Sequence, residues 1–322
     1  MPKQKKALVT GAGGFIGHHL VKYLQNKGYW VRGVDIKYPE FSTKKQADQF
    51  MKADLREKRN CIKAAEEMDE VYNLAANMGG IGFITFHTSD VLYDNVLINA
   101  NMAEACKQAK VERIFYSSSA CVYPIAKQKN PNVTALKESD AYPGDPDNEY
   151  GWEKLFSERL YTAYKNYYKV RIARFHNIFG EEGTYEGGRE KAPAAMCRKV
   201  AKTKDGSTIE IWGDGKQTRS FCHVDDCIDA VYGLMQSDHD EPINIGSDRL
   251  VTINQLADIV SKIANKKLTK KHLLDKPQGV RGRNSDNKLF KKKFGWAPPR
   301  ITLEEGLERN YKWIEDHIKK GG

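Results

Sequence analysis

The sequence predicts an α/β protein with a doubly wound parallel sheet and a smaller lobe toward the C-terminus. Three observations support this fold class. A glycine-rich turn joins an apolar strand to an amphipathic helix in "KALVTGAGGFIGHHLVKYL" near the N-terminus. Strand-like and helix-like stretches then alternate as far as Gly180. Beyond this point the alternation ends, and glycine-rich loops and shorter strand-like pieces follow.

The first part of the chain contains a strand, a turn, a helix and a second strand. Residues 7–10 form a short apolar strand, and from Phe15 the apolar residues recur at helical spacing. Gly28 fits the C-terminal cap of this helix, because such caps need a left-handed backbone. The second strand ends at Asp35. Strand patterns recur in "EVYNLAA", "VERIFYSSS" and "VRIARFHNIFG" with helical stretches between them, which predicts helices on both faces of a parallel sheet.

The chain beyond Gly180 provides the smaller lobe. A loop leads into a helix, and "TIEIWGDGKQTRSFCHVDD" holds two strand-like pieces around a Gly-Asp-Gly turn. "EPINIGS" is typical of a strand that returns to the main sheet, and the rest is expected to be helix, loop and helix. We expect residues 1–179 to form the first domain, with residues 222–246 returning to it. Residues 180–221 and 247–322 are expected to form the second, substrate-binding lobe.

The composition indicates a globular protein without membrane spans. Hydrophobic residues make up 40% of the chain and charged residues 29%. No apolar run approaches the roughly 20 residues that a membrane-spanning helix requires. The segment "MPKQKKALVTG" passes directly from a basic tip into a strand, which leaves no room for a signal peptide. We therefore expect a cytoplasmic protein with no membrane partner.

The cysteines indicate reduced thiols. They lie at positions 61, 106, 121, 197, 222 and 227, and no pair has the C-x-x-C spacing of a zinc or redox site. In the cytoplasm at least five of them are expected to be small apolar core residues. We expect no metal site. Cys121 follows a run of three serines in "FYSSSACVYP", and this position raises the question of a chemical role.

The net charge of +10 comes from small, scattered lysine clusters. They lack the interleaved aromatic residues of a base-stacking platform. We interpret them as a solvated basic surface, with attraction of an anionic substrate or weak nucleic-acid binding as the alternatives. No nucleic-acid partner is expected.

The glycine turn predicts a dinucleotide site on a Rossmann-type sheet. Gly11, Gly14 and Gly17 form G-x-x-G-x-x-G at a strand-to-helix junction. Glycines let backbone N–H groups approach a pyrophosphate, and the helix N-terminus favours its negative charge. We assign this part of the cofactor site to the three glycines and to Phe15 and Ile16 between them.

Asp35 at the end of the second strand indicates which dinucleotide binds. A carboxylate at this position can accept hydrogen bonds from a ribose hydroxyl and repels a 2′-phosphate. Arg32 and Lys37 are nearby cations, but Asp35 has the better position. The sequence therefore predicts NAD in preference to NADP.

Tyr150 and Lys154 form the pattern Y-x-x-x-K in "NEYGWEKLFSERL", which places both on one face of a helix. A nearby ammonium and a positive nicotinamide would lower the pKa of the tyrosine, so that it could act as a base at neutral pH. Ser119 lies upstream, at the end of a serine-rich strand. With the dinucleotide turn, these residues predict a catalytic site.

The glycine turn, Asp35, "NLAA" (73–76), Ser119 and the Tyr150/Lys154 pair resemble the extended short-chain dehydrogenase/reductases that act on nucleotide sugars. Six further segments are similar to the GDP-mannose 3,5-epimerase family: "MGGIGF" (78–83), "SSACVYP" (118–124), "RFHNIFG" (174–180), "GGREKAPAA" (187–195), "WGDGKQTRSF" (212–221) and "GVRGRNSDN" (279–287). The run "GGREKAPAA" is the most specific of them. The resemblance covers nearly the whole chain and implies bound NAD, a GDP-mannose-type nucleotide sugar as substrate, and a homodimer.

The resemblance also implies a role for Cys121. In that family the cysteine is an acid/base group, and the lysine of "REKAP" is its partner, which matches Lys191 here. Transient oxidation of the sugar at C4 makes the C3 and C5 protons acidic, because loss of either proton gives an enolate. One group must remove a proton and another must return one from the opposite face, giving GDP-L-galactose, GDP-L-gulose or both. In the implied cycle Tyr150 takes the C4 hydroxyl proton while Ser119 binds the same oxygen.

The same resemblance implies a set of substrate-binding residues: Gly79, Ser119, Ala120, Cys121, Asn177, Glu190, Lys191, Ala192, Lys199, Gln217, Thr218 and Arg219. In "GVRGRNSDN" either Arg281 or Arg283 should bind the diphosphate through its two-pronged guanidinium, and we prefer Arg283 slightly. Asp54, after the third strand, is expected on the adenine side of the cofactor.

Two other functions fit parts of the pattern. A nucleotide-sugar 4-epimerase or 4,6-dehydratase would use the same scaffold, but a dehydratase usually has Thr-Asp-Glu where this chain has Ser-Ala-Cys, and a 4-epimerase has no use for "GGREKAP". A non-catalytic NAD-binding protein associated with RNA would fit the net charge, but it would not need Tyr150 or Lys154.

Overall fold

The main sheet of the computed structural model, which describes residues 4–41 and 47–321, has seven strands in the order β11-β6-β5-β4-β1-β2-β3. Every pairing in this sheet is parallel. The strands are β1 (Lys6–Thr10), β2 (Trp30–Asp35), β3 (Gln49–Lys52), β4 (Glu70–Asn73), β5 (Arg113–Ser119), β6 (Lys169–Phe175) and β11 (Ile243–Ile245). The predicted Rossmann-type parallel sheet is confirmed, and "EPINIGS" provides the strand β11 beside β6.

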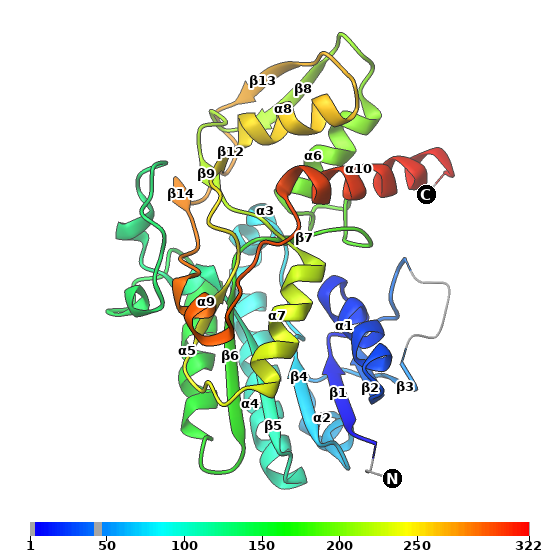
Figure 1. The fold of residues 1–322 in the computed structure, drawn as a ribbon, viewed down its shortest axis with the longest axis vertical. Coiled ribbons are helices and arrows are strands. Elements are labelled where there is room, and N and C mark those ends of the chain that lie inside the picture. Colours follow the sequence, from blue (N-terminus) through cyan, green and yellow to red (C-terminus); the bar gives the residue numbers. More distant parts are fainter. Residues whose placement is uncertain (1–3, 42–46, 322) are drawn as a thin grey trace.

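Helices cover both faces of the sheet (Figure 1). On one face lie α1 (Phe15–Asn26) and α7 (Val224–Gln236), and on the other lie α2 (Lys58–Ala65), α4 (Thr88–Ala109) and α5 (Glu149–Ala163). The strands are apolar on both sides because each side is buried under helices, as Ile114, Phe115 and Tyr116 of β5 illustrate. The expected helix cap is also present, since Gly28 follows α1 with φ +85°.

Short elements follow the carboxyl ends of the strands, where ligands bind in sheets of this type. They are α3 (Ile81–Phe86), the 3₁₀ turns η1 (Ala120–Val122), η2 (Ile125–Gln128) and η3 (Glu138–Ala141), and the paired strands β7 (Ile178–Phe179) and β10 (Cys222–His223). The turn η1 directly continues β5, so the serine run leads into the edge of the sheet that faces the smaller lobe.

The smaller lobe has its own apolar core and forms the upper part of Figure 1. It contains α6 (Ala192–Lys202), α8 (Ile253–Ile263), α10 (Leu303–Lys319), β8 (Thr208–Trp212), β9 (Thr218–Arg219), β12 (Val251–Thr252), β13 (Thr269–Leu273) and β14 (Gly282–Arg283). The helix α9 (Lys288–Phe294) lies instead against the main sheet, where Phe290 joins the core beside α7.

The expectation of only helix, loop and helix after β11 was wrong. β13 pairs in parallel with β8, and β12 and β14 flank β9. The sequence of β13, "TKKHL", hides its strand because it lies at a largely exposed edge and shows no apolar alternation.

Among residues 4–41 and 47–321, no helix combines the length and the apolar composition that crossing a bilayer would require.

Candidate active site

Tyr150 and Lys154 lie buried at the start of α5, one turn apart. Asn148 caps this helix, and its side chain accepts a hydrogen bond from Gly151 N at 3.0 Å. Lys154 Nζ donates to Ser117 O at 3.1 Å and lies 5.6 Å from the centre of the Tyr150 ring. The structure therefore brings together the two residues of the Y-x-x-x-K pattern at the end of β5.

A close approach between α5 and η1 sets the position of Tyr150. A Cβ on Gly151 would lie 2.3 Å from Cys121 O, so only glycine allows this contact. Ser119, the last residue of β5, hydrogen-bonds the Tyr150 side chain, and its Oγ also accepts from Cys121 N at 3.2 Å. Ser119, Cys121 and Tyr150 thus share one site.

The expected lowering of the Tyr150 pKa includes the charge of a bound nicotinamide and stays a prediction; the chain's own groups act in the opposite direction. Burial raises the pKa of Tyr150 well above its usual value, and the nearby Cys121 adds to this effect, while Ser119 and Arg283 oppose it. Burial also lowers the pKa of the Lys154 ammonium. The reason is loss of hydration, which penalises the charged form of both groups.

Cys121 differs from the other five cysteines. All six are free thiols in the described part of the chain, and Cys121 is half-buried while the others are buried. A nitrogen of the Arg283 guanidinium, Nη1, donates to Cys121 Sγ at 3.1 Å. The sulfur also acts electrostatically on the pKa values of Tyr150, Lys154 and Lys191. Cys121 therefore lies among the groups that could exchange protons with a substrate.

Lys191 is the N-terminal cap residue of α6. Burial lowers the pKa of its ammonium, and the Cys121 sulfur acts in the opposite direction. The loop before it is fixed to residues 77–80, because Gly80 N donates to Arg189 O at 3.1 Å. The Arg189 guanidinium also stacks 3.8 Å from the Phe83 ring centre. These contacts hold the lysine of "REKAP" on the same side of the molecule as Cys121.

The two arginines that could bind the diphosphate, Arg281 and Arg283, have different contacts in the structure. Arg281 forms an ion pair with Asp214, with both nitrogen–oxygen distances at 3.0 Å. Arg283 is buried beside Cys121, and its Nε donates to Gln128 Oε1 at 2.6 Å. Its Nη2 lies 3.6 Å from Asp147 Oδ1, and neither atom has a hydrogen-bond partner. Of the two arginines, Arg283 therefore contacts Cys121, whereas Arg281 pairs with Asp214.

Two further predicted substrate residues lie near the strand that carries this arginine: Arg219 of β9 pairs with Arg283 of β14, and Gln217 directly precedes β9. Burial and the Arg283 charge lower the pKa of Arg219 to about 9, while Cys121 and Asp147 oppose this shift. Gln217 Nε2 donates to Trp212 O at 3.0 Å, and its buried Oε1 has no partner. The neighbouring guanidinium groups of Arg219 and Arg283 suit an anionic ligand, whereas the Gln217 oxygen is an acceptor and would pair with a hydrogen-bond donor.

The other predicted substrate residues have varied surroundings. Thr218 Oγ1 donates to Pro131 O, and Asn177 Nδ2 donates to Ser220 O at 2.9 Å. Glu190 forms an ion pair with Arg198 at 3.0 Å. Lys199 donates to Glu210 O at 2.7 Å and is therefore directed at β8. Gly79 and Ala120 are buried, and Ala192 begins α6.

The glycine turn fits the phosphates of a dinucleotide. Gly11 has φ +69°, and a Cβ on Gly17 would lie 2.0 Å from Gly11 O. Gly13 N donates to Asp35 Oδ2 at 3.0 Å, which connects the turn to the end of β2. Side chains at these glycines would collide with neighbouring backbone, so glycine preserves the tight turn at the start of α1, and a turn of this kind fits the pyrophosphate of NAD.

The other predicted cofactor residues lie around this turn. Phe15 and Ile16 open α1 and are half-buried. Burial raises the pKa of Asp35, while hydrogen bonds from backbone N–H groups of Lys37 and Gly13 lower it. Asp54 lies two residues after β3, and its carboxylate forms an ion pair with Arg56 at 2.6 Å.

Sequence reasoning missed three residues that shape the site. Gln128 and Asp147 both approach Arg283, and Arg189 fixes the loop that carries Lys191. Arg189 lies inside the specific run "GGREKAPAA" and could have been noticed there. Gln128 ends the 3₁₀ turn η2 and Asp147 lies in the loop before α5, and neither belongs to a motif, so only the fold reveals them.

The fold and the site together define an extended short-chain dehydrogenase/reductase that uses NAD. The chain belongs to the NAD dependent epimerase/dehydratase family, whose profile matches residues 7–246. This confirms the expected family and cofactor.

Similar proteins refine this classification. The chain is 48% identical to GDP-mannose 3,5-epimerase of Arabidopsis thaliana over 98% of this chain and 83% of that protein. It is 46% identical to GDP-mannose 3,5-epimerase 1 of Oryza sativa subsp. indica over 99% of this chain and 84% of that protein. Among solved structures, UDP-glucuronic acid 4-epimerase from Bacillus cereus, in complex with UDP-glucuronic acid and NAD, superposes with a TM-score of 0.81 at 27% identity, covering 97% of this chain and 99% of that one.

Proposed function

We propose that this protein epimerises GDP-mannose at C3 and C5 through transient oxidation at C4, giving GDP-L-galactose, GDP-L-gulose or both. The observation that carries the proposal is the position of Cys121. A half-buried thiol lies beside Ser119 and Tyr150, with a guanidinium 3.1 Å from its sulfur. The similarity to two GDP-mannose 3,5-epimerases supports the same substrate.

The oxidation step uses Ser119, Tyr150 and Lys154. The glycine turn and Asp35 would hold NAD, which would supply the hydride acceptor for oxidation at C4 and the hydride for the return step. Tyr150 takes the proton of the C4 hydroxyl, and Ser119 hydrogen-bonds the same oxygen. The Lys154 ammonium, 5.6 Å from the tyrosine ring centre, stabilises the phenolate that results. Burial of both side chains keeps water away from the proton transfer.

The epimerisation step uses Cys121 and Lys191. One group takes a proton from the carbon beside the C4 ketone, and the other returns a proton from the opposite face of the ring. Loss of hydration lowers the pKa of Lys191, which favours the neutral amine that a base requires. Arg283 Nη1 donates to the Cys121 sulfur at 3.1 Å, which fixes the position of this side chain in the site.

We propose that Arg283 binds the diphosphate and that Gln217, Thr218 and Arg219 complete its surroundings. Arg281 is engaged by Asp214 and takes no part in this proposal. We further propose that residues 1–179 and 222–246 form the NAD-binding domain and that residues 180–221 and 247–322 form the substrate-binding lobe, although Ser119 and Cys121 act on the substrate from the first domain and α9 packs on the main sheet.

Product analysis tests the proposal. Purified protein is incubated with GDP-mannose or with UDP-glucose, and proton NMR identifies the sugars formed. New GDP-hexoses inverted at C5, or at C3 and C5, from GDP-mannose alone would support it. Inversion at C4 of either substrate would instead show a 4-epimerase, and loss of water a dehydratase.

We also propose a homodimer that forms through α4 and α5. These helices expose apolar side chains, with Tyr93 of α4 at 65% exposure and Trp152 and Phe156 of α5 at 47% and 51%. Trp152 and Phe156 lie one turn apart and share a face. Light scattering should give twice the chain mass for the wild type and the chain mass for Trp152→Glu/Phe156→Glu.

A cytoplasmic location without a nucleic-acid partner completes the proposal. Six free thiols suit a reducing compartment. Several lysines of the basic clusters are engaged within the fold: Lys266 donates to three backbone oxygens near the end of α6, and Lys270 and Lys319 pair with Asp258 and Glu315. Binding of RNA at low salt that disappears steeply with added salt would show only the general attraction of a basic surface.

A further inference from the structure

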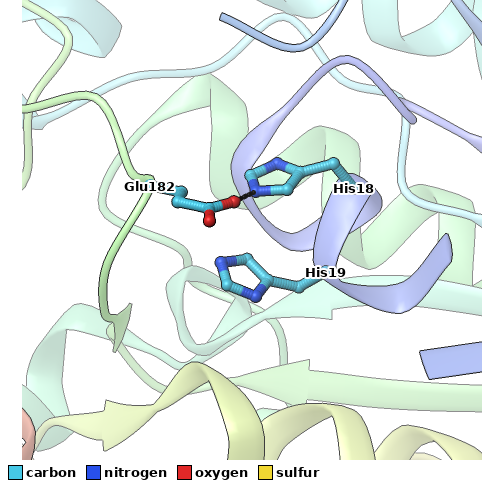
Figure 2. Close-up of side chains that lie close together, drawn as sticks. All are labelled: His18, His19 and Glu182. Atoms are coloured by element: carbon cyan, nitrogen blue, oxygen red, sulfur yellow. Dashed lines mark hydrogen bonds and ion pairs between the residues drawn. The ribbon is translucent and has the colours of Figure 1, made fainter. Parts of the chain in front are cut away.

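Two adjacent histidines of α1 and a glutamate from the segment after β7 form a cluster outside the site described above. His18, His19 and Glu182 each offer one ligand atom, and these atoms lie within 4.8 Å of one another. Figure 2 shows both imidazole rings facing the Glu182 carboxylate. His18 is buried and the other two are half-buried, so the cluster is partly shielded from water.

A neutral imidazole cannot donate to both hydrogen-bond acceptors that lie next to the His18 ring. Its Nδ1 lies 2.8 Å from Gly14 O, and its Nε2 lies 2.7 Å from Glu182 Oε2. Both partners are acceptors, but a neutral imidazole carries only one N–H group. Either tautomer therefore leaves a bare nitrogen lone pair against an oxygen. A second proton on the ring would satisfy both contacts; a metal ion bound to Nε2 would satisfy them too, with the carboxylate beside the nitrogen as a second ligand, because 2.7 Å is too short for an ion between the two atoms.

We propose that this cluster binds a divalent first-row metal ion such as Zn²⁺, with His18 Nε2, a ring nitrogen of His19 and the Glu182 carboxylate as ligands. Two imidazoles and one carboxylate are a ligand set that Zn²⁺ commonly uses, with a further position left for water. The contact of His18 Nδ1 with Gly14 O supplies the outer hydrogen bond that typically orients a metal-binding histidine. Glu181 O, 3.0 Å from His19 Nε2, is a further oxygen at the rim of the cluster.

Lys22 is the competitor of the metal for Glu182. Its Nζ lies 2.8 Å from Glu182 Oε2, and its side chain is 41% exposed. The ammonium can therefore move into water when an ion binds. Removal of this rival should strengthen metal binding, by up to about fivefold for an exposed ion pair.

The metal would connect two parts of the cofactor region. His18 and His19 lie in the first turns of α1, directly after the glycine turn, whereas Glu182 follows β7 and Gly180. An ion between them would hold the start of α1 against this segment. Its effect is therefore structural, and it should appear as a Zn²⁺-dependent rise in melting temperature.

Metal titration of the full-length protein tests the proposal. Chelator-treated protein is titrated with Co²⁺, followed by visible absorption, and with Zn²⁺, followed by calorimetry. We expect one ion per chain, with affinity reduced roughly 100-fold by His18→Gln or Glu182→Gln. Lys22→Gln should bind more tightly than the wild type. His272→Gln, which removes an exposed histidine of β13, should bind like the wild type.

Three results would overturn the proposal. The first is absence of stoichiometric binding in the wild type. The second is equal affinity in the wild type and the Glu182→Gln variant, which would place the metal on other histidines. The third is an NMR titration in which His18 stays doubly protonated at neutral pH, because the second proton would then satisfy both contacts. The Lys22→Gln and Glu182→Gln variants keep the test valid if His18→Gln fails to fold.

Discussion

Substitution of Arg283 by glutamine should selectively weaken the binding of the nucleoside diphosphate. The guanidinium is buried, and its Nη2 forms no hydrogen bond, although it lies 3.6 Å from Asp147 Oδ1. A hydrogen bond between charged groups contributes about 1.5–3 kcal/mol. Its loss corresponds to roughly tenfold to hundredfold weaker binding of GDP.

Arg281→Gln is the matched control, because the two arginines are neighbours in "GVRGRNSDN". Arg281 pairs with Asp214 at 3.0 Å, and the two side chains are 32% and 36% exposed. Exposed pairs contribute about 0–1 kcal/mol to stability. We therefore expect little change in GDP affinity and a small change in stability for this variant.

A second substitution separates lost binding from lost folding. Arg283→Gln leaves the Asp147 carboxylate, which is 11% exposed, without its cation. Breaking a buried pair in this way costs about 3–5 kcal/mol of stability. Arg283→Gln/Asp147→Asn should recover much of the free energy of unfolding in urea, but it should not recover GDP affinity.

Calorimetric titration with GDP measures the effect, and GMP serves as the control ligand because it lacks the β-phosphate. The preference for GDP over GMP should shrink in Arg283→Gln and persist in Arg281→Gln. If Arg281→Gln loses this preference while Arg283→Gln keeps it, the assignment of the diphosphate to Arg283 is wrong.

Three further predictions concern the cofactor, the catalytic base and acid stability. Asp35→Ala should weaken NAD binding and reduce the discrimination against NADP in a fluorescence titration; preference of the wild type for NADP would contradict the role of Asp35. Tyr150→Phe keeps the ring but removes the base, so turnover of GDP-mannose should fall ~10²- to 10⁴-fold, and an unchanged rate would exclude the assigned role. Although burial alone raises the pKa of Glu181, hydrogen bonds from His223 and Arg309 lower it to about 2 in the folded chain. The stability that this carboxylate contributes is present above its usual pKa of about 4.5 and is lost as the pH falls toward 2. In urea unfolding, Glu181→Gln should therefore reduce the change in free energy of unfolding between these pH values by about 3 kcal/mol. An unchanged pH profile would contradict the pairing.

The sequence predicted the parts of the molecule that depend on local pattern. Strands buried on both faces appear as apolar runs, and the glycine turn needs backbone conformations that few other residues adopt. Tyr150 and Lys154 lie one helical turn apart, so their proximity follows from the helix alone. The strand β11 could be predicted because "EPINIGS" is apolar and bounded by turn residues.

The parts that the sequence did not predict depend on contacts between distant segments. Asp147 approaches Arg283 only because the loop before α5 packs against the strand β14 segment. The choice between Arg281 and Arg283 depends on Asp214, which engages the first of them. The pKa of Tyr150 rises because burial outweighs the nearby cations, and a sequence does not show the extent of burial.

Proton exchange with solvent tests the central claim most directly. GDP-mannose is incubated with the protein in D₂O, and NMR follows the protons at C3, C4 and C5. The wild type should incorporate deuterium at C5, and at C3 where the reaction proceeds to the doubly inverted sugar, while C4 retains its proton. Cys121→Ala should lose this exchange, whereas Cys61→Ala, which removes a buried thiol of α2, should retain it. Exchange at C5 in Cys121→Ala at the wild-type rate would contradict the account, because Cys121 would then be a packing residue.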